Sequence, residues 1–311
     1  MKYCYGVDIG GTTVKMGLFE ENGNILDKWE IVTRVEDEGK AILPDIAASI
    51  LEKTKEHGLE KTDIIGIGAG VPAPVTADGI VNGSANLGWK YKEVKRELEE
   101  LTGITSVIGN DANVAALGEM WKGGGAGQKN MVMITLGTGV GGGVIINGRV
   151  ITGEHGAGGE VGHLCVNYDE QDTCGCGNHG CLEQYASATG IVRLAKKRLE
   201  RENRETVLKK ESVTAKDVFD AVKAGDAVAI DVAEEFGNYL ASGLMNLAVI
   251  ADPAVIVIGG GVSKAGEVLI PFIQKPYREK AFFANRDIEF KLATLGNDAG
   301  ICGSAKMILD A

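Results

Sequence analysis

Short apolar runs and amphipathic stretches alternate along the whole chain. Apolar runs bounded by glycine or polar residues predict buried strands, and apolar residues at helical spacing predict helices. The strands are expected at 3–8, 14–19, 24–29, 63–70, 104–108, 131–136, 144–146, 254–258 and 288–293. The helices are expected at 40–57, 91–101, 114–121, 182–198, 214–223, 226–250 and 299–309. This mixture of helices and strands predicts an α/β protein.

One strand pattern occurs twice. Residues 7–29 follow the order strand, Gly/Thr turn, strand, Asn-Gly turn and strand, and residues 131–149 repeat it. A glycine-dense segment, 123–127, separates the copies and is typical of a hinge. The second copy also has the glycine spacing of a dinucleotide-binding fingerprint, but a strand follows where that motif requires a helix. We therefore predict an internal duplication and not a Rossmann domain.

Charge and hydropathy narrow the classes of partner. The chain has 311 residues and a formal net charge of −11 with a pI near 5.0, which opposes nucleic-acid binding because phosphate contacts need clustered Lys and Arg. Its one basic run, 193–210, is interleaved with glutamates and predicts a solvated helix face. No apolar run reaches the length of a membrane span, and the first residues lack the form of a signal peptide. We expect a cytoplasmic protein without a membrane partner.

Three cysteines separated mainly by glycines indicate a metal site. Cys174, Cys176 and Cys181 crowd one short segment, which brings no apolar surface for a core. With one histidine they would complete a closed tetrahedral zinc site, in which the metal shapes the loop and does not react. His163 and His179 are the rival nitrogen ligands, and we prefer His163 because it lies in a glycine-rich approach beside a carboxylate. The remaining thiols, those of Cys4, Cys165 and Cys302, are expected to be small core residues.

Asp111 follows the strand at 104–108 after Gly109 and Asn110, within the sequence Asn110-Asp-Ala-Asn113. Ligands of open α/β sheets bind at the carboxyl ends of strands, so this carboxylate is a candidate for catalysis. The alternative is N-capping of the helix at 114–121, which Asp or Asn can serve. Both roles can coexist if Asn113 is the cap.

Other polar residues suit a small ligand. Glu160, Glu183 and His163 surround the metal-held turn, and their acceptors and donor fit sugar hydroxyls, which both give and accept protons. Asn86 and Trp89 lie in a polar loop where they could contact the same ligand. Solvated surface charges are the alternative for the two carboxylates.

The first Gly/Thr turn is a candidate phosphate site. Gly10, Gly11 and Thr12 offer backbone N–H groups and a hydroxyl, Asp8 before them suits a hydrated magnesium ion, and Lys15 follows. A simple hairpin is the alternative. Three glycines at 259–261, after a buried strand, would let a nucleotide base approach the backbone.

Together these motifs resemble the ROK sugar kinases of the actin-like ATPase superfamily, over the whole chain. The resemblance rests on Asp8-Ile-Gly-Gly-Thr-Thr-Val-Lys15, Asn110-Asp-Ala-Asn113, Leu136-Gly-Thr-Gly-Val-Gly-Gly-Gly143, Glu160-Val-Gly-His163 and Cys174-Gly-Cys-Gly-Asn-His-Gly-Cys181-Leu-Glu183. It implies a two-domain, ribonuclease H-like fold with an interdomain cleft. The first domain would span 1–121 with the helix at 299–311, and the second would span 122–298 with the zinc loop 163–181.

The same resemblance, closest to the bacterial glucokinases, implies ATP-dependent phosphorylation of glucose at its 6-hydroxyl with Mg²⁺ and a structural Zn²⁺. Asp111 would be the general base. The implied sugar ligands are Asn86, Asn110, Asp111, Glu160, His163 and Glu183. The implied nucleotide-binding residues are Asp8, Gly10, Gly11, Thr12, Lys15, Gly137, Thr138, Gly139, Gly260 and Gly261. A homo-oligomer, dimer or tetramer, is expected. The alternatives are an N-acetylhexosamine or mannose/fructose kinase of the same family and a sugar sensor without catalysis.

Overall fold

The computed structural model describes residues 1–311, which form two compact units. The first unit contains Met1–Gly127, Val150–Gly159 and Asn297–Ala311, and the second contains Gln128–Arg149 and Glu160–Gly296. The C-terminal helix therefore packs in the first unit. Residues 150–159 also pack there, although the sequence analysis assigned them to the second domain. The chain passes back and forth between the two units, and a pattern of predicted helices and strands does not show where it does so.

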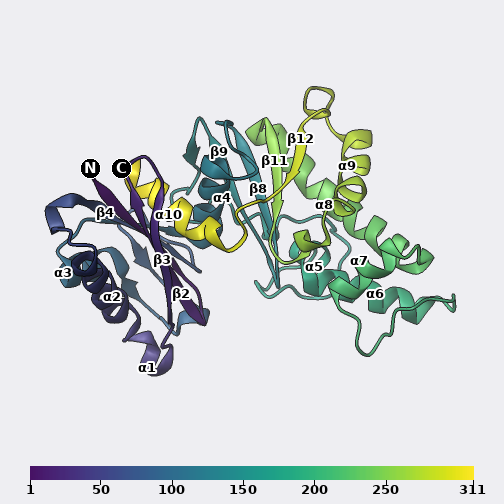
Figure 1. Ribbon diagram of the computed structural model, residues 1–311. Helices are drawn as coiled ribbons and strands as arrows, with labels where there is room; N and C mark the ends of the chain where they lie inside the picture. The colour runs from purple at the N-terminus through teal and green to yellow at the C-terminus, as the bar shows by residue number, and fades with distance from the viewer. The chain divides into compact units, whose positions relative to one another are not determined.

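The first unit is built on a sheet of order β3-β2-β1-β4-β7 (Figure 1). The strands β1, β2 and β3 are antiparallel, and β4 and β7 continue the sheet in parallel with β1. These strands are β1 (Tyr3–Ile9), β2 (Thr13–Glu20), β3 (Ile25–Val32), β4 (Ile64–Val71) and β7 (Ser106–Asn110), with a separate pair β5 (Ile80–Val81) and β6 (Lys92–Glu93). The helices are α1 (Glu36–Gly39), α2 (Ile42–Glu56), α3 (Val94–Thr102), α4 (Asp111–Lys122) and α10 (Ala299–Leu309). Parallel strands followed by helices place the end of β7 at the carboxyl edge of the sheet.

The two faces of this sheet are covered differently. On one face α2 contributes apolar side chains such as Ile46 and Ile50 to a core with β1 and β4. On the other face α10 lies directly on the strands, since a Cβ at Gly68 of β4 would be 1.8 Å from the Ser304 carbonyl oxygen. A Cβ at Gly303 would likewise meet the Val114 carbonyl oxygen of α4 at 1.7 Å. Glycine is therefore required at both contacts, and α10 holds α4 in position behind the edge of the sheet.

The second unit repeats the topology of the first, with a sheet of order β10-β9-β8-β11-β12. Its strands are β8 (Met131–Leu136), β9 (Val140–Ile146), β10 (Arg149–Val150), β11 (Val255–Gly259) and β12 (Glu289–Leu292). Its helices are α5 (Glu183–Ala186), α6 (Ala188–Arg201), α7 (Ala215–Lys223), α8 (Ala227–Ala251) and α9 (Leu269–Lys280). Because β8 pairs antiparallel with β9, which neighbours β10, and two strands parallel to β8 again follow on its other side, the predicted duplication is confirmed.

Two helical predictions need correction. The single helix expected at 182–198 is two helices, because Ser187 leaves the helical conformation and caps α6 by accepting a hydrogen bond from the Gly190 N–H. Helix α9 was not predicted at all. It begins at Leu269 without a side-chain cap and contains Pro276, so the usual signals of a helix are missing. None of the helices is both long enough and apolar enough to cross a lipid bilayer.

Candidate functional site

Asp111 stands where β7 passes into α4. The strand ends at Asn110, and the Asn110 Oδ1 accepts a hydrogen bond from the Asn113 N–H at 3.1 Å, which makes Asn110 the N-cap. The prediction that Asn113 is the cap is therefore wrong. The Asp111 side chain, half-buried, is the first of the helix, and its Oδ1 accepts from the Ala112 N–H at 2.8 Å. A carboxylate at a helix N-terminus interacts favourably with the positive end of the helix dipole.

Asn113 instead joins α4 to the segment 150–159 through its side chain. Its side chain is 3% exposed, and its Nδ2 donates to the Gly158 carbonyl oxygen at 3.0 Å. The contact ties the segment 150–159 to α4, one turn from Asp111. The Asn110 Nδ2 similarly donates to the Ala73 carbonyl oxygen at 3.2 Å, so protein partners fix both amides.

The first Gly/Thr turn joins β1 to β2. The Gly10 N–H donates to the Thr13 carbonyl oxygen at 3.0 Å, while Gly11 and Thr12 are exposed. Asp8 is half-buried beside this turn, and the pKa of its carboxyl group is raised because partial burial outweighs the opposing charge of Lys15. The turn therefore presents exposed backbone and a carboxylate on the same end of the sheet, as a phosphate and magnesium site requires.

Asn86 and Trp89, which share one loop, differ in their surroundings. Asn86 is exposed and lies against the first turn, because a Cβ at Gly11 would be 3.6 Å from the Asn86 Cβ. Trp89 is 4% exposed, and its Nε1 donates to the Gly39 carbonyl oxygen at 3.2 Å. The expectation that Trp89 contacts a ligand is therefore wrong, since its ring belongs to the core.

The second Gly/Thr turn joins β8 to β9, and hydrogen bonds from the start of α6 hold it. The Gly137 carbonyl oxygen accepts from the Ala188 N–H at 2.8 Å, and the Thr138 carbonyl oxygen accepts from the Thr189 hydroxyl at 2.9 Å. The N-terminus of α6 thus fixes the turn. The break at Ser187 places the N-terminus of α6 next to this turn. A single unbroken helix would have no N-terminus at this position.

Glu183 reaches the same turn. Its Oε2 accepts from the Val140 N–H at 2.9 Å. From the other side, the turn at Val161–His163 packs on β9, since a Cβ at Gly162 would be 2.2 Å from the Val140 carbonyl oxygen. Glu183 and the turn that carries His163 therefore converge on one residue at the start of β9, directly after the glycines of the second turn.

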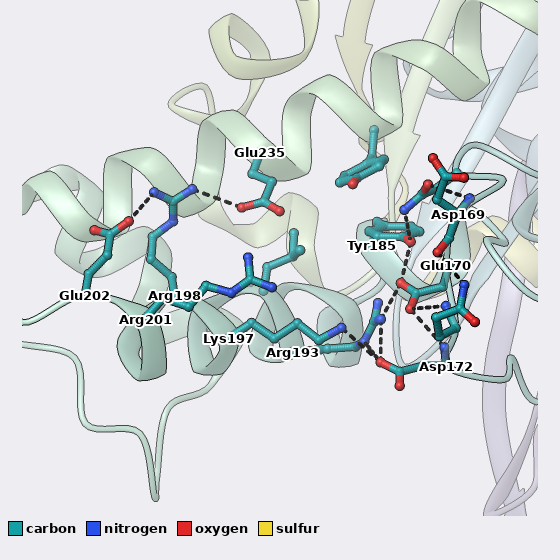
Figure 2. A pocket seen from close by; sticks show the side chains of 14 residues that line it. Asp169, Glu170, Asp172, Tyr185, Arg193, Lys197, Arg198, Arg201, Glu202 and Glu235 are labelled. Carbon is teal, nitrogen blue, oxygen red and sulfur yellow. Dashed lines mark hydrogen bonds and ion pairs between the residues drawn. The ribbon is translucent and has the colours of Figure 1, made fainter.

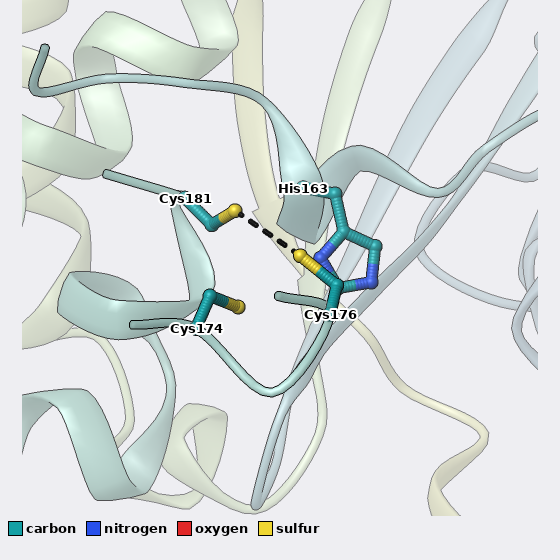
Figure 3. Close-up of side chains that lie close together, drawn as sticks. All are labelled: His163, Cys174, Cys176 and Cys181. Carbon is teal, nitrogen blue, oxygen red and sulfur yellow. Dashed lines mark hydrogen bonds between the residues drawn. The ribbon is translucent and has the colours of Figure 1, made fainter. Parts of the chain in front are cut away.

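Four side chains form a possible metal site in the second unit (Figure 3). The ligand atoms of His163, Cys174, Cys176 and Cys181 all lie within 4.8 Å of one another, and the Cys176 and Cys181 sulfurs are 3.6 Å apart. The His179 ring is elsewhere, with its Nδ1 3.2 Å from the Asp172 carbonyl oxygen. The structure thus groups His163 with the thiols, as the sequence analysis preferred. On the far side of the imidazole, the His163 Nε2 lies 4.0 Å from the Glu160 carboxylate.

A cluster of charges fastens this loop to α6 (Figure 2). The Arg193 guanidinium contacts the carboxylates of Glu170 and Asp172 and donates to the Gln184 carbonyl oxygen at 3.2 Å. Burial disfavours the charged form of Glu170, but hydrogen bonds from Arg193 and Tyr185 outweigh it and lower the pKa of this carboxyl to about 2. The prediction of a solvated helix face at 193–210 is therefore wrong for Arg193, which joins both ends of the cysteine loop.

A cavity of about 380 Å³ lies beside the glycines that follow β11. Gly260 has a positive φ of 82° and presses against the end of β8, where a Cβ would be 2.5 Å from the Leu136 N. The walls are mostly apolar and come from the start of α6, from α7 and from the turn after β11. They include Ala188, Thr214, Phe219, Lys223, Gly261 and Val262. The sequence analysis missed the contribution of α7, because nothing in its amphipathic pattern separates a cavity wall from a core face.

The candidate residues form one group in each unit. Asp8, the first turn, Asn86, Asn110 and Asp111 gather in the first. The second turn, Glu183, the metal-ligand cluster and the cavity gather in the second. Each group combines a phosphate-binding type of turn with carboxylates.

The comparisons with known proteins agree with this arrangement. The family model described as "ROK family" matches residues 4–311. A glucokinase from Halalkalibacterium halodurans is 45% identical over 99% of this chain and 95% of that protein. The solved structure of a ROK hexokinase from Thermus thermophilus is 31% identical, with a TM-score of 0.84 and coverage of 99% of this chain and 100% of that one. A ROK glucokinase from Streptomyces griseus in complex with glucose and AMPPNP is 33% identical, with a TM-score of 0.78 and the same coverage. The predicted two-domain actin-like fold is confirmed.

Proposed function

Because this chain belongs to the ROK family, we propose that it is an ATP-dependent glucokinase, which transfers the γ-phosphoryl group of ATP to the 6-hydroxyl of glucose. The observation that carries the proposal is full-length similarity to glucokinases together with Asp111 at the carboxyl end of β7. A sugar sensor without catalysis would not need a carboxylate at that position.

Asp111 is the proposed general base. Its carboxylate takes the proton of the 6-hydroxyl as the sugar oxygen forms its bond to the γ-phosphorus and the bond from that phosphorus to the bridging oxygen of ADP breaks. In phosphoryl transfer the protein mainly positions the reactants and stabilises charge, so the fixed rotation of Asp111, with its Oδ1 on the Ala112 N–H, contributes directly.

The proposed sugar ligands are side chains that can exchange hydrogen bonds with hydroxyl groups. Asn110 precedes Asp111 in the chain, and Asn86 lies against the first Gly/Thr turn. Glu160 lies beside His163 of the metal-ligand cluster, and Glu183 accepts from the Val140 N–H. Carboxylates accept from sugar hydroxyls, whereas the imidazole can donate or accept. We propose glucose as the preferred sugar, since an N-acetyl group would displace a hydroxyl that these residues can pair with, at a cost of roughly 1–3 kcal/mol.

The proposed nucleotide-binding residues include the glycines of the two Gly/Thr turns and the two glycines that follow β11. Gly10, Gly11 and Thr12 with Gly137, Thr138 and Gly139 would cradle phosphates, and Lys15 would add a positive charge. Magnesium held near Asp8 would neutralise charge on the phosphate oxygens when bound. The adenosine would occupy the cavity beside Gly260 and Gly261, where Phe219 offers an apolar wall for a flat base.

We propose that the metal site binds one structural zinc ion. Three thiolates and one imidazole are the ligand set that tetrahedral zinc prefers, and a set of four leaves no position open for catalysis. Ligation through one ring nitrogen would fix the direction of the other, so that His163 meets a sugar hydroxyl in a defined orientation. The free cysteines fit a reducing compartment, which supports the cytoplasm as the location.

The domain division expected from the sequence, 1–121 with 299–311 and 122–298, is proposed for the functional domains, except that residues 122–127 and 150–159 pack in the first unit. Residues 123–127 are the proposed hinge. The assembly is proposed to be a homo-oligomer. Exposed apolar side chains in the second unit, Phe282 at 54% and Phe283 at 75%, support it. Light scattering of the purified protein measures the mass directly.

The test of the function is a coupled assay of ADP release with glucose, mannose, fructose, N-acetylglucosamine and N-acetylmannosamine at equal concentrations. We expect the highest kcat/KM for glucose. Higher kcat/KM for an N-acetylated sugar would assign the enzyme to another substrate, and sugar binding without any ADP release would assign the chain to the sensors.

A further inference from the structure

A fourth thiol lies next to the metal-ligand cluster without belonging to it. Cys165 is paired with Cys181 across a short antiparallel bridge. The Val166 N–H donates to the Gly180 carbonyl oxygen at 2.8 Å, and the Leu182 N–H donates to the Leu164 carbonyl oxygen at 2.8 Å. These two bonds flank the cysteines, which makes them a non-hydrogen-bonded pair, the closer of the two kinds of antiparallel pair.

The two cysteine side chains share one face of this bridge. Leu164, Val166 and Leu182, their neighbours along the chain, belong to or pack against the core of the second unit. Because side chains alternate along extended backbone, Cys165 and Cys181 point away from that core on the same face of the bridge, and the Cys181 sulfur belongs to the metal-ligand cluster. The Cα atoms of such a pair are about 4.5 Å apart, which lies within the range of disulfide-bonded cysteines.

Cys165 is also the reachable thiol of the pair. It is half-buried, whereas Cys181 is 1% exposed and belongs to the His163 cluster. The Cys165 sulfur has only a weak contact, at 3.8 Å, with the His179 carbonyl oxygen. The two other cysteines outside the cluster, Cys4 and Cys302, are buried in the first unit. The expectation that Cys165 is an ordinary core thiol is therefore wrong.

We propose that Cys165 is an oxidation site, at which a peroxide drives formation of a Cys165–Cys181 disulfide and release of the metal. The inference rests on the proposed zinc site. The Cys165 sulfur attacks one oxygen of hydrogen peroxide, the O–O bond breaks, and the products are Cys165 sulfenic acid and one water. The Cys181 thiolate then attacks the Cys165 sulfur and displaces hydroxide, which takes a proton to form the second water. Two thiol sulfurs are oxidised, and the peroxide is reduced.

The consequence follows from the geometry of the cluster. Cys181 cannot keep its bond to the metal once its sulfur is bonded to Cys165, so the closed set of four falls to three and the metal is lost. His163 and the loop between Cys174 and Cys181 then lose their anchor. Oxidation therefore lowers the affinity for glucose through the proposed sugar ligand His163, and reduction with added zinc restores it.

The positions of the glutamates allow the disulfide to be located by peptide mapping. Cleavage after glutamate yields residues 161–170, with Cys165 alone, and residues 171–183, with the three cluster cysteines. The zinc-loaded enzyme is treated with hydrogen peroxide, alkylated without reduction and digested. We expect these two peptides linked through Cys165 and Cys181, one zinc released per disulfide as measured with a chromophoric chelator, and a glucose KM raised at least tenfold and restored by dithiothreitol with zinc.

Two variants serve as controls. Cys165→Ser keeps every proposed metal ligand, and we expect its zinc release at the same peroxide dose to be at least tenfold slower than that of the parent. Cys302→Ala, which also removes one thiol, should release zinc like the parent. Equal release from Cys165→Ser and the parent, or a disulfide confined to the peptide 171–183, would overturn the proposal. If Cys165→Ser does not fold, the peptide map of the parent still decides. Absence of zinc from the untreated enzyme would refute the metal site separately.

Discussion

Gly139→Ala is expected to lower kcat/KM for glucose by displacing Glu183, and this effect does not require bound nucleotide. From the sequence alone, a side chain at this position would be expected only to fill space needed by phosphate. In the structure a Cβ at Gly139 would lie 2.3 Å from the Glu183 Oε2, far inside contact distance. The carboxylate must therefore move, and it then loses its 2.9 Å hydrogen bond from the Val140 N–H.

The size of the effect follows from this one bond. Hydrogen bonds to charged groups contribute about 1.5–3 kcal/mol. Glu183 is a proposed sugar ligand, so the loss of its fixed position acts on glucose and its transition state. Since about 1.4 kcal/mol corresponds to a factor of ten, kcat/KM for glucose should fall by roughly 10- to 100-fold.

Gly137→Ala in the same turn is the matched comparison. A Cβ at Gly137 would have no neighbour nearer than the Gly139 carbonyl oxygen at 4.0 Å, so this variant leaves Glu183 in place. Steady-state kinetics with glucose and ATP varied in turn, together with glucose binding by calorimetry without nucleotide, separates the two. Gly139→Ala should weaken glucose binding even without ATP, whereas Gly137→Ala should change chiefly the KM for ATP. Glucose binding by Gly139→Ala equal to that of the parent would refute the reasoning.

Three further outcomes are expected. Asp111→Asn should keep glucose affinity and lose on the order of 10²–10⁴-fold in kcat, since an amide cannot take the proton; turnover near that of the parent would remove Asp111 from the role of base. Removal of metal, or Cys176→Ala, should raise the glucose KM more than the ATP KM and lower the thermal midpoint, because metal binding is coupled to folding of the loop. Metal analysis should find about one zinc per chain. An unchanged glucose KM in zinc-free protein would make the metal a remote structural ion. Glu170→Gln should destabilise the second unit at pH 7 by up to about 3 kcal/mol, because the pKa of Glu170 is lowered from 4.5 to about 2. That stabilisation is fully present above about pH 4.5 and is lost as the pH falls toward 2, so thermal midpoints of parent and variant should converge there; a constant difference from pH 7 to pH 2 would contradict the assignment.

The repeated strands could be predicted because their signals are local. Both copies depend on turns whose residues tolerate the required backbone, as at Asn147 and Gly148, where φ is 54° and 77°. The cysteine cluster was equally readable, since its three thiols lie within one short loop. In each case the residues that meet in space are near one another in the chain.

Two of the errors share one physical cause, which is a partner that lies far away in the chain. Asn110 and Asn113 are both good N-caps, and the choice depends on Gly158, which takes the Asn113 amide from another part of the chain. Arg193 belongs to a helix that looks solvated, and its acidic partners lie in the cysteine loop. A helical periodicity shows which face is polar and cannot show whether that face meets water or a charged neighbour.

Val140 illustrates why the complete site cannot be predicted from sequence patterns. As an apolar residue after a glycine turn it carries no functional side chain, yet its N–H binds Glu183 and its carbonyl oxygen lies against Gly162, beside His163. Backbone groups are the same in every residue, so the sequence holds no signal for this role. The glycines around it hold one indirectly: Gly139 and Gly162 must lack a Cβ because carboxylate and backbone approach within the space that a methyl group would fill. Part of the glycine content of these motifs is therefore explained by contacts within the protein itself, before any phosphate is considered.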